Sequence, residues 1–321
     1  MDAIQKNMMV FAGTSNLPMA QKIAEHLGVE LGDVKVEKFA NGEIYARYMQ
    51  SVRGADVFIV QSVSGQVNDA LMELLIMTDA AKRASARTVT AVITHYGYAR
   101  QDKKSASREP ITAKLVANLY EVAGVDRVIA MDLHQGQIQG FFDIPVNHLT
   151  ALPVFADHFA AKKMDNLCVV SPDGGRAKAA KKLSDLLDCD LAIMAKNRPE
   201  HNKAEVSTVI GNVEGKNCVV NDDMIDTAGT ICASMAALKE AGAKSIHVCA
   251  THGLFSGPAV ERIAASVCDE VVVTDTVPLS EAAQNCPKIK VISVSDLFAR
   301  AIHNVYTETS VSEFFDPDFQ L

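Results

Sequence analysis

The sequence has few aromatic residues and no long apolar segment. Its 321 residues include no tryptophan, and aromatic side chains make up 6%. No apolar run approaches the roughly 18 residues that a membrane-spanning helix needs, and no basic stretch leads into an apolar segment near the amino terminus. We therefore expect no membrane partner, no signal peptide and a cytoplasmic location.

The chain also lacks a net positive charge and cysteine pairs. Lys and Arg number 31 against 39 Asp and Glu, a net charge of −8. That balance disfavours nucleic acid as a partner. The seven cysteines all lie at or after Cys168, and no two form a CxxC motif. We expect them to be reduced and mostly buried. An anionic ligand would need local basic clusters or metal ions.

Apolar strand-like runs alternate with amphipathic helix-like segments along the chain, which predicts an α/β protein with mostly parallel sheets flanked by helices. The length predicts two domains, at roughly 150 residues each, and we expect 1–150 and 151–302, with 303–321 packing back on the first. Expected strands are 8–12, 34–39, 44–49, 57–61, 88–94, 128–131, 167–170, 191–194, 218–220, 245–250 and 270–273. Expected helices are 17–27, 67–84, 111–123 with Pro110 opening its first turn, 177–187, 230–241, 258–265 and 296–304. The polar segment His201–Glu205 is expected to form a mobile loop.

Polar segments follow several of the predicted strands. Ligands of open α/β sheets bind beyond the carboxyl ends of the strands, so these segments are the candidate site. They are 94–104, 132–134, 171–175, 196–198 and 221–230.

The most specific of these is the motif Asn221-Asp-Asp-Met-Ile-Asp-Thr-Ala-Gly-Thr230. Its small residues before a predicted helix allow backbone N–H groups to face a phosphate. The adjacent carboxylates suit sugar hydroxyls or Mg²⁺. A capped helix after an acidic turn is the non-functional alternative. Neither a Walker A loop nor GxGxxG occurs in the chain.

The 221–230 motif resembles the sugar-phosphate signature of type I phosphoribosyltransferase folds. By itself it leaves open whether 5-phosphoribosyl 1-pyrophosphate (PRPP) is consumed or made. Further segments resemble the ribose-phosphate pyrophosphokinases, or PRPP synthetases: 51–54, 68–77, 97–103 (GYARQDK), 113–118, 132–134 (DLH), 137–145 and 251–258. The resemblance runs from about Phe39 to Ser312 and favours the phosphate-activated, Mg²⁺-dependent class. It implies two phosphoribosyltransferase-like domains and transfer of pyrophosphate from ATP to ribose 5-phosphate, for nucleotide, His and Trp biosynthesis.

The resemblance also assigns residues to each ligand. ATP would be held in the first domain by Phe39, Asn41, Glu43, Arg100, Gln101, Lys103 and His134, with Phe39 to Glu43 donated by a neighbouring subunit. Ribose 5-phosphate would be held in the second domain by Asp222, Asp223, Asp226, Thr227, Ala228, Gly229 and Thr230. His134 and Asp173 would bind Mg²⁺, and Lys196 and Arg198 would form a catalytic loop that neutralises phosphate charge.

A regulatory site for activating inorganic phosphate or inhibitory ADP is implied at a subunit interface of a homohexamer. Its residues would be Ser51, Arg53, Lys104, Arg108, Gln139, Ser310 and Ser312. Ordinary interface polarity is the alternative interpretation of this set.

Some positions depart from the family pattern. Arg176 stands where a glycine of SPDxGG is expected, which suggests either a blocked backbone approach or a new phosphate contact. Other departures are Tyr96, Asn147, His148, Ala179, Ala195 and Asn221. Two alternative functions follow: a non-catalytic regulatory relative, for which Arg176 is the argument, and a phosphoribosyltransferase, which would not need the ATP-site residues.

Overall fold

The computed structural model describes residues 7–197 and 206–312. The predicted loop His201–Glu205 and the candidate Arg198 lie outside the described residues. The chain divides into two compact units. Unit 1 consists of Met1–Thr150, Thr276–Pro278 and Val294–Leu321, and unit 2 of Ala151–Asp275 and Leu279–Ser293. None of the helices within the described ranges is long and apolar enough to cross a membrane.

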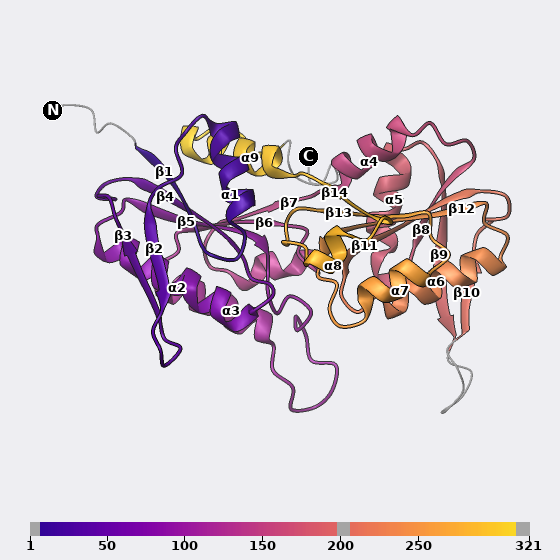
Figure 1. Ribbon diagram of the computed structural model, residues 1–321, viewed down its shortest axis with the longest axis horizontal. Helices are drawn as coiled ribbons and strands as arrows, with labels where there is room; N and C mark the ends of the chain where they lie inside the picture. Colours follow the sequence, from indigo (N-terminus) through magenta and orange to yellow (C-terminus); the bar gives the residue numbers. More distant parts are fainter. Residues whose placement is uncertain (1–6, 198–205, 313–321) are drawn as a thin grey trace. The chain divides into compact units, whose positions relative to one another are not determined.

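Unit 1 is built on a five-stranded parallel sheet in the order β1-β4-β5-β6-β7. Its elements are β1 (Met8–Ala12), α1 (Leu17–Leu27), β2 (Val34–Lys38), β3 (Ile44–Tyr48), β4 (Asp56–Ser62), α2 (Val67–Arg83), β5 (Thr88–His95), α3 (Thr112–Ala123), β6 (Arg127–Met131), a 3₁₀ turn at Gly136–Phe141, β7 (Val146–Leu149) and α9 (Ser295–Thr307). Helices α1 and α9 cover one face and α2 and α3 the other (Figure 1). Every residue of β4 is buried, as expected of a strand covered on both faces.

Strands β2 and β3 form a separate antiparallel hairpin. The hydroxyl of Tyr48 on β3 donates a hydrogen bond to the carbonyl of Met77 on α2, at 2.9 Å. The Tyr48 ring also packs edge-on against Phe11 of β1. These contacts fix the base of the hairpin and leave its turn, residues 39–43, exposed.

Unit 2 is built on a seven-stranded sheet in the order β10-β9-β8-β11-β12-β13-β14, parallel except for the pair β9–β10. Its elements are α4 (Leu152–Ala161), β8 (Leu167–Ser171), a 3₁₀ turn at Gly174–Arg176, α5 (Ala177–Leu186), β9 (Asp190–Asn197), β10 (Val206–Ile210), β11 (Asn217–Ile225), α6 (Gly229–Glu240), β12 (Ser245–Gly253), α7 (Ala259–Ala265), β13 (Glu270–Thr274), α8 (Glu281–Gln284) and β14 (Ile289–Ile292). Helices α4 and α5 lie on one face and α6 and α7 on the other (Figure 1). The predicted α/β class is confirmed.

The predicted strands and helices are present, with three kinds of correction. Pro110 does not lie in the first turn of α3, because the N-cap of that helix is Ile111. Strand β11 continues five residues past the predicted end at Val220, so the two carboxylates lie within the strand. The elements missed were α4, α8, β7, β10 and β14. Helix α4 had a readable signal, with Pro153 in its first turn and apolar residues at helical spacing from Leu152 to Phe159.

Candidate active site

Strand β11 carries the acidic pair Asp222 and Asp223 near its carboxyl end. Asp222 lies opposite Ala250 of β12, and both neighbouring strands are parallel to β11. The two carboxylates differ in exposure: 21% of the Asp222 side chain is accessible but only 3% of that of Asp223. The Asp223 backbone N–H donates to Asp222 Oδ1 at 2.9 Å. The site therefore holds two carboxylates close together with little solvent.

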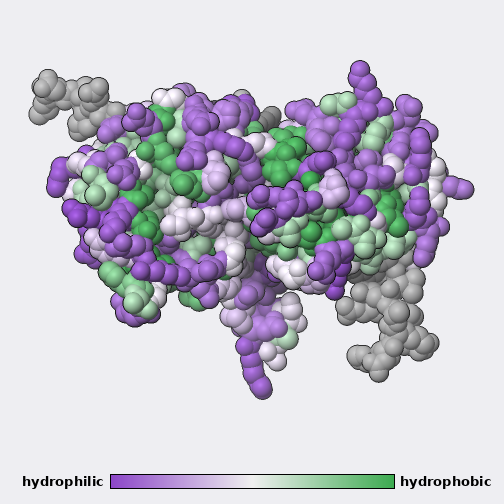
Figure 2. Space-filling view, viewed as in Figure 1, coloured by the Kyte–Doolittle hydropathy of each residue, from purple (hydrophilic) through white to green (hydrophobic). Residues whose placement is uncertain are grey.

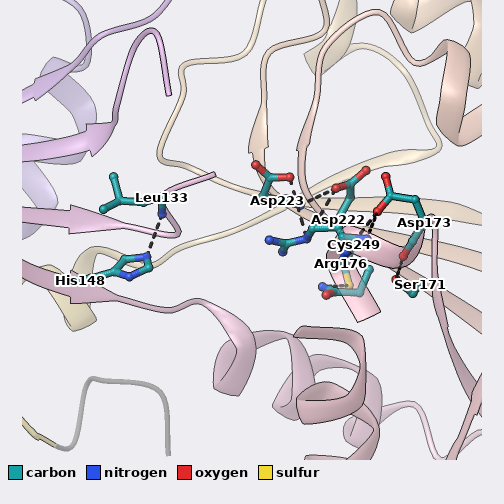
Figure 3. Close-up of polar contacts among 10 residues, drawn as sticks. Leu133, His148, Ser171, Asp173, Arg176, Asp222, Asp223 and Cys249 are labelled. Carbon is teal, nitrogen blue, oxygen red and sulfur yellow. Dashed lines mark hydrogen bonds and ion pairs between the residues drawn. The ribbon is translucent and has the colours of Figure 1, made fainter. Parts of the chain in front are cut away.

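Arg176 reaches this pair from the turn that follows β8. Its Nε lies 3.8 Å from Asp222 Oδ1 and 3.9 Å from Asp223 Oδ1 (Figure 3). Asp173 shapes the turn, because its Oδ1 accepts the backbone N–H groups of Gly175 at 2.9 Å and Arg176 at 3.1 Å. The Ser171 hydroxyl donates to the Asp173 carbonyl at 2.6 Å. Asp173, a candidate metal ligand, is therefore also the N-cap of the turn that carries Arg176.

The ionisation of Asp222 reflects this crowding. Burial and the neighbouring charge of Asp223 raise the pKa of Asp222 to about 7, and the positive charge of Arg176 opposes them. Behind the pair, Asn221 Nδ2 donates to the buried thiol sulfur of Cys249 at 3.4 Å. All seven cysteines are free thiols, as expected.

The loop between β11 and α6, residues 226–230, has the conformation of an anion-binding turn and is called the cradle below. Ala228, the N-cap of the 12-residue helix α6, has φ +59° and ψ +8°, the left-handed conformation. This conformation costs a non-glycine residue roughly 1–2 kcal/mol and is found at ligand-binding turns. It turns the chain so that Gly229 and Thr230 begin the helix with their N–H groups at its positive end.

Two contacts brace this cradle from the segment after β12. The Ser256 backbone N–H donates to the Asp226 carbonyl at 2.9 Å. Arg262 of α7 donates from Nη1 to the Thr227 carbonyl, also at 2.9 Å. The sequence analysis missed Arg262, since its role depends on a contact between residues 35 positions apart.

The chemistry of the donor set fits a divalent cation bound together with substrate. Among residues 7–197 and 206–312, no three His, Cys, Asp or Glu side chains gather closely enough to hold a metal ion by themselves. Mg²⁺ commonly takes one or two carboxylates, completing its shell with water and phosphate oxygens. Asp222 and Asp223 supply such oxygens. Of the other two candidate ligands, His134 belongs to unit 1 and Asp173 to unit 2.

The Phe39 segment forms the turn of the β2–β3 hairpin. The Phe39 N–H donates to the Glu43 carbonyl at 2.8 Å, and the Glu43 N–H donates to Asn41 Oδ1 at 3.2 Å. Phe39 is half exposed, packed only loosely against Tyr45, with ring centroids 5.8 Å apart. An exposed aromatic ring on a fixed turn is suited to stacking on a planar ligand.

Arg100, Gln101 and Lys103 lie in the loop that follows β5. The loop projects from unit 1 (Figure 1), and the face drawn in Figure 2 shows its hydrophilic tip. Gln101 anchors it to the start of α3, accepting from the Thr112 hydroxyl at 2.6 Å. Arg100 and Lys103 are exposed, so this loop presents positive charge to solvent.

His134 follows β6 and is partly exposed. Beside it, the Leu133 N–H donates to His148 Nε2 at 2.9 Å (Figure 3). Gln139 contacts His148 Nδ1 at 3.3 Å. The departure at His148 therefore holds the loop that carries His134. Tyr96 is buried and donates to the Ala113 carbonyl, and Asn147 accepts from Arg127.

The candidate regulatory residues fall into several groups within unit 1. Arg53 donates from its backbone to Ser51 and from its side chain to Ser85 at 3.2 Å. Ser310 and Ser312 share a hydrogen bond of 2.9 Å after α9. Lys104 and Arg108 are exposed in the loop after β5, and Gln139 lies beside His148.

Of the candidate catalytic loop, the backbone of Lys196 is described. It lies near the end of β9, opposite Ser207 of β10. Ala195 and Ala179 lie on β9 and α5, and nothing in the structure explains either departure.

A parallel sheet with an acidic strand end, followed by a tight turn into a helix amino terminus, is the arrangement of a phosphoribosyltransferase-type α/β protein. Two family models match the chain: the N-terminal domain of ribose phosphate pyrophosphokinase over residues 8–124, and the phosphoribosyl synthetase-associated domain over residues 170–316.

Individual relatives cover almost the whole chain. The ribose-phosphate pyrophosphokinase of Fusobacterium nucleatum subsp. nucleatum is 53% identical over 97% of this chain and 98% of its own length. That of Bacillus caldolyticus is 52% identical over 98% of this chain and 100% of its own. The crystal structure of phosphoribosylpyrophosphate synthetase from Mycobacterium smegmatis matches with a TM-score of 0.89 and 44% identity, covering 94% of this chain and 99% of that one. The chain belongs to the ribose-phosphate pyrophosphokinase family.

Proposed function

We propose that this chain catalyses pyrophosphoryl transfer from ATP to the 1-hydroxyl of ribose 5-phosphate, yielding PRPP and AMP. The observation that carries the proposal is the full-length match to ribose-phosphate pyrophosphokinases. The cradle at the start of α6, beside two carboxylates, supplies the recognition that a phosphorylated sugar requires.

In the proposed reaction, Asp222 and Asp223 accept hydrogen bonds from ribose hydroxyls, and the Asp226–Thr230 loop binds the 5-phosphate. Backbone N–H groups at the helix start and the Thr227 and Thr230 hydroxyls are suitable donors. Arg262 keeps the loop in shape through the Thr227 carbonyl. Together these contacts would orient the 1-hydroxyl for attack on phosphorus.

ATP is assigned to unit 1. The half-exposed Phe39 ring stacks on adenine, with Asn41 and Glu43 beside it on the hairpin turn. Arg100, Gln101 and Lys103 bind phosphate oxygens, and a guanidinium suits these bidentately. His134, in the loop after β6, is a further ATP-binding residue.

The 1-hydroxyl oxygen attacks the β-phosphorus and its proton passes to solvent. The bond between the α,β-bridging oxygen and the β-phosphorus breaks, and AMP leaves with that electron pair. Lys196 and Arg198 neutralise the charge that develops. In unit 2, Asp222, Asp223 and Asp173 would be ligands of Mg²⁺, and in unit 1 His134 would be a ligand. Mg²⁺ supplies charge neutralisation of the polyphosphate when bound.

We further propose a homohexamer in the cytoplasm, activated by inorganic phosphate and inhibited by ADP at the site of Ser51, Arg53, Lys104, Arg108, Gln139, Ser310 and Ser312. The exposed Phe39 turn supports assembly, because a ring that serves a neighbouring subunit must protrude. Sedimentation equilibrium with and without phosphate tests the assembly. Loss of phosphate activation in Arg53→Ala, with basal turnover retained, tests the regulatory site.

The first experiment is AMP formation from ATP and Mg²⁺, with and without ribose 5-phosphate. AMP that depends on the sugar phosphate and equals the PRPP formed is the expected result. Bound ATP without AMP would identify a regulatory relative, and consumption of PRPP with a nucleobase would identify a phosphoribosyltransferase. No finding favours either alternative.

A further inference from the structure

Arg176 contacts the acidic pair through charge rather than through hydrogen bonds. Its Nε lies 3.8 and 3.9 Å from one oxygen of Asp222 and one of Asp223 (Figure 3). Charge-assisted hydrogen bonds between nitrogen and oxygen are about 2.7–2.9 Å long. Within the described residues, the buried Nε–H has no hydrogen-bond partner. A permanent structural ion pair would be expected to satisfy this donor.

The Arg176 side chain nevertheless has little freedom to move. The side chain is only 16% exposed, and the Asp173 carboxylate caps the turn that carries it. Nearly equal distances to the two carboxylates place the positive charge beside both. A divalent cation bound by this pair would compete with that charge for the same oxygens.

We propose that Arg176 is a displaceable counter-ion of the acidic pair, which weakens divalent-metal binding there until an anionic substrate takes up the guanidinium. The proposal rests on the proposed function for the identity of that substrate, a phosphorylated pentose. The unfilled Nε–H is the donor that hydrogen-bonds to an oxygen of the substrate. Arg176 is thus a specificity-determining residue that couples metal binding to the presence of the sugar phosphate.

The test measures Mn²⁺ binding by the spin-resonance signal of free Mn²⁺, without ATP and without turnover. Arg176→Gln is expected to bind Mn²⁺ about tenfold more tightly than the wild-type protein, because a repelling charge has been removed. Arg176→Lys keeps the charge and stays within about threefold of wild type. Lys181→Gln, which removes an exposed charge from α5, is the matched control and leaves the affinity unchanged. Asp223→Asn is expected to abolish tight Mn²⁺ binding, which would show that the ion binds at the acidic pair.

Ribose 5-phosphate then reports the coupling. It should tighten Mn²⁺ binding in the wild-type protein by about tenfold and in Arg176→Gln by much less. Equal Mn²⁺ affinity of wild type and Arg176→Gln without the sugar would overturn the proposal. Arg176→Met replaces the Gln variant if that variant does not fold, and failure of both neutral variants to fold would make Arg176 a structural ion pair and also overturn it. Mn²⁺ binding is measured independently of AMP formation. A protein that forms no AMP would refute the proposed function, whereas the Mn²⁺ affinities would still test the role of Arg176.

Discussion

Glu270 should stabilise unit 2 through a charge cluster remote from the proposed site. Glu270 begins β13 and is 8% exposed. Its Oε1 lies 2.8 Å from Lys162 Nζ and 3.0 Å from His247 Nδ1. His158 Nε2 is a further 3.7 Å contact. The perturbation is Glu270→Gln, which removes the charge and keeps the shape.

The magnitude follows from the ionisation of this carboxyl. Burial raises the pKa of Glu270, but hydrogen bonds and charges from His247 and Lys162 outweigh it and lower the pKa from 4.5 to about 2. That difference corresponds to about 3 kcal/mol of stability. Because the folded-state pKa is the lower one, the contribution is complete above pH 4.5 and is lost as the pH falls toward 2.

Urea unfolding of wild type and Glu270→Gln at pH 7 and pH 3 measures this. We expect a loss of about 3 kcal/mol at pH 7, shrinking to about 1.5 kcal/mol at pH 3. The exposed control Glu261→Gln should change stability by less than about 0.5 kcal/mol. The KM for ribose 5-phosphate should be unchanged, because Glu270 and His247 lie near the amino ends of their strands and the proposed ligands beyond the carboxyl ends. A difference that is the same at both pH values would refute the reasoning.

Three further predictions concern the proposed ligand sites. Arg262→Ala should raise the KM for ribose 5-phosphate about tenfold and leave that for ATP unchanged, because the Thr227 carbonyl loses its brace; equal rises in both KM values in steady-state assays would contradict this. Phe39→Ala should raise the KM for ATP about tenfold at a thermal-melt cost below about 0.5 kcal/mol, since the ring is half exposed; an unchanged KM would remove Phe39 from the ATP site. Ala228→Val should destabilise the fold by at least about 2 kcal/mol in urea unfolding, because a β-branched residue resists φ +59°; wild-type stability would show that the turn can relax.

Much of the architecture was readable from local patterns. Helix α1 begins and ends where predicted, because Pro18 sets its first turn and Gly28 closes it with a left-handed conformation. The residues buried on α2 include Leu71, Leu74 and Thr78, whose spacing of three to four residues places them on one side of a helix. Such signals act over four to eight residues, so the chain itself contains them.

Other features depend on contacts between distant segments. Glu73 is buried on α2 because Thr14 and Gln61, from the ends of β1 and β4, donate hydrogen bonds to its carboxylate, and nothing next to it in sequence indicates this. The missed strands β7 and β14 are four residues each and have their partners elsewhere in the chain.

The candidate site divides in the same way. The acidic pair and the proposed phosphate-binding loop could be named from the sequence alone, since the 221–230 motif is continuous and its small residues are those that a tight anion-binding turn requires. Only the tertiary structure decided that β11 extends through the pair, that Arg262 braces the cradle and that Arg176 faces both carboxylates. The physical reason is that Arg176 and Arg262 reach the site from the segments that follow β8 and β12, and the packing of these two strands against β11 sets the distances.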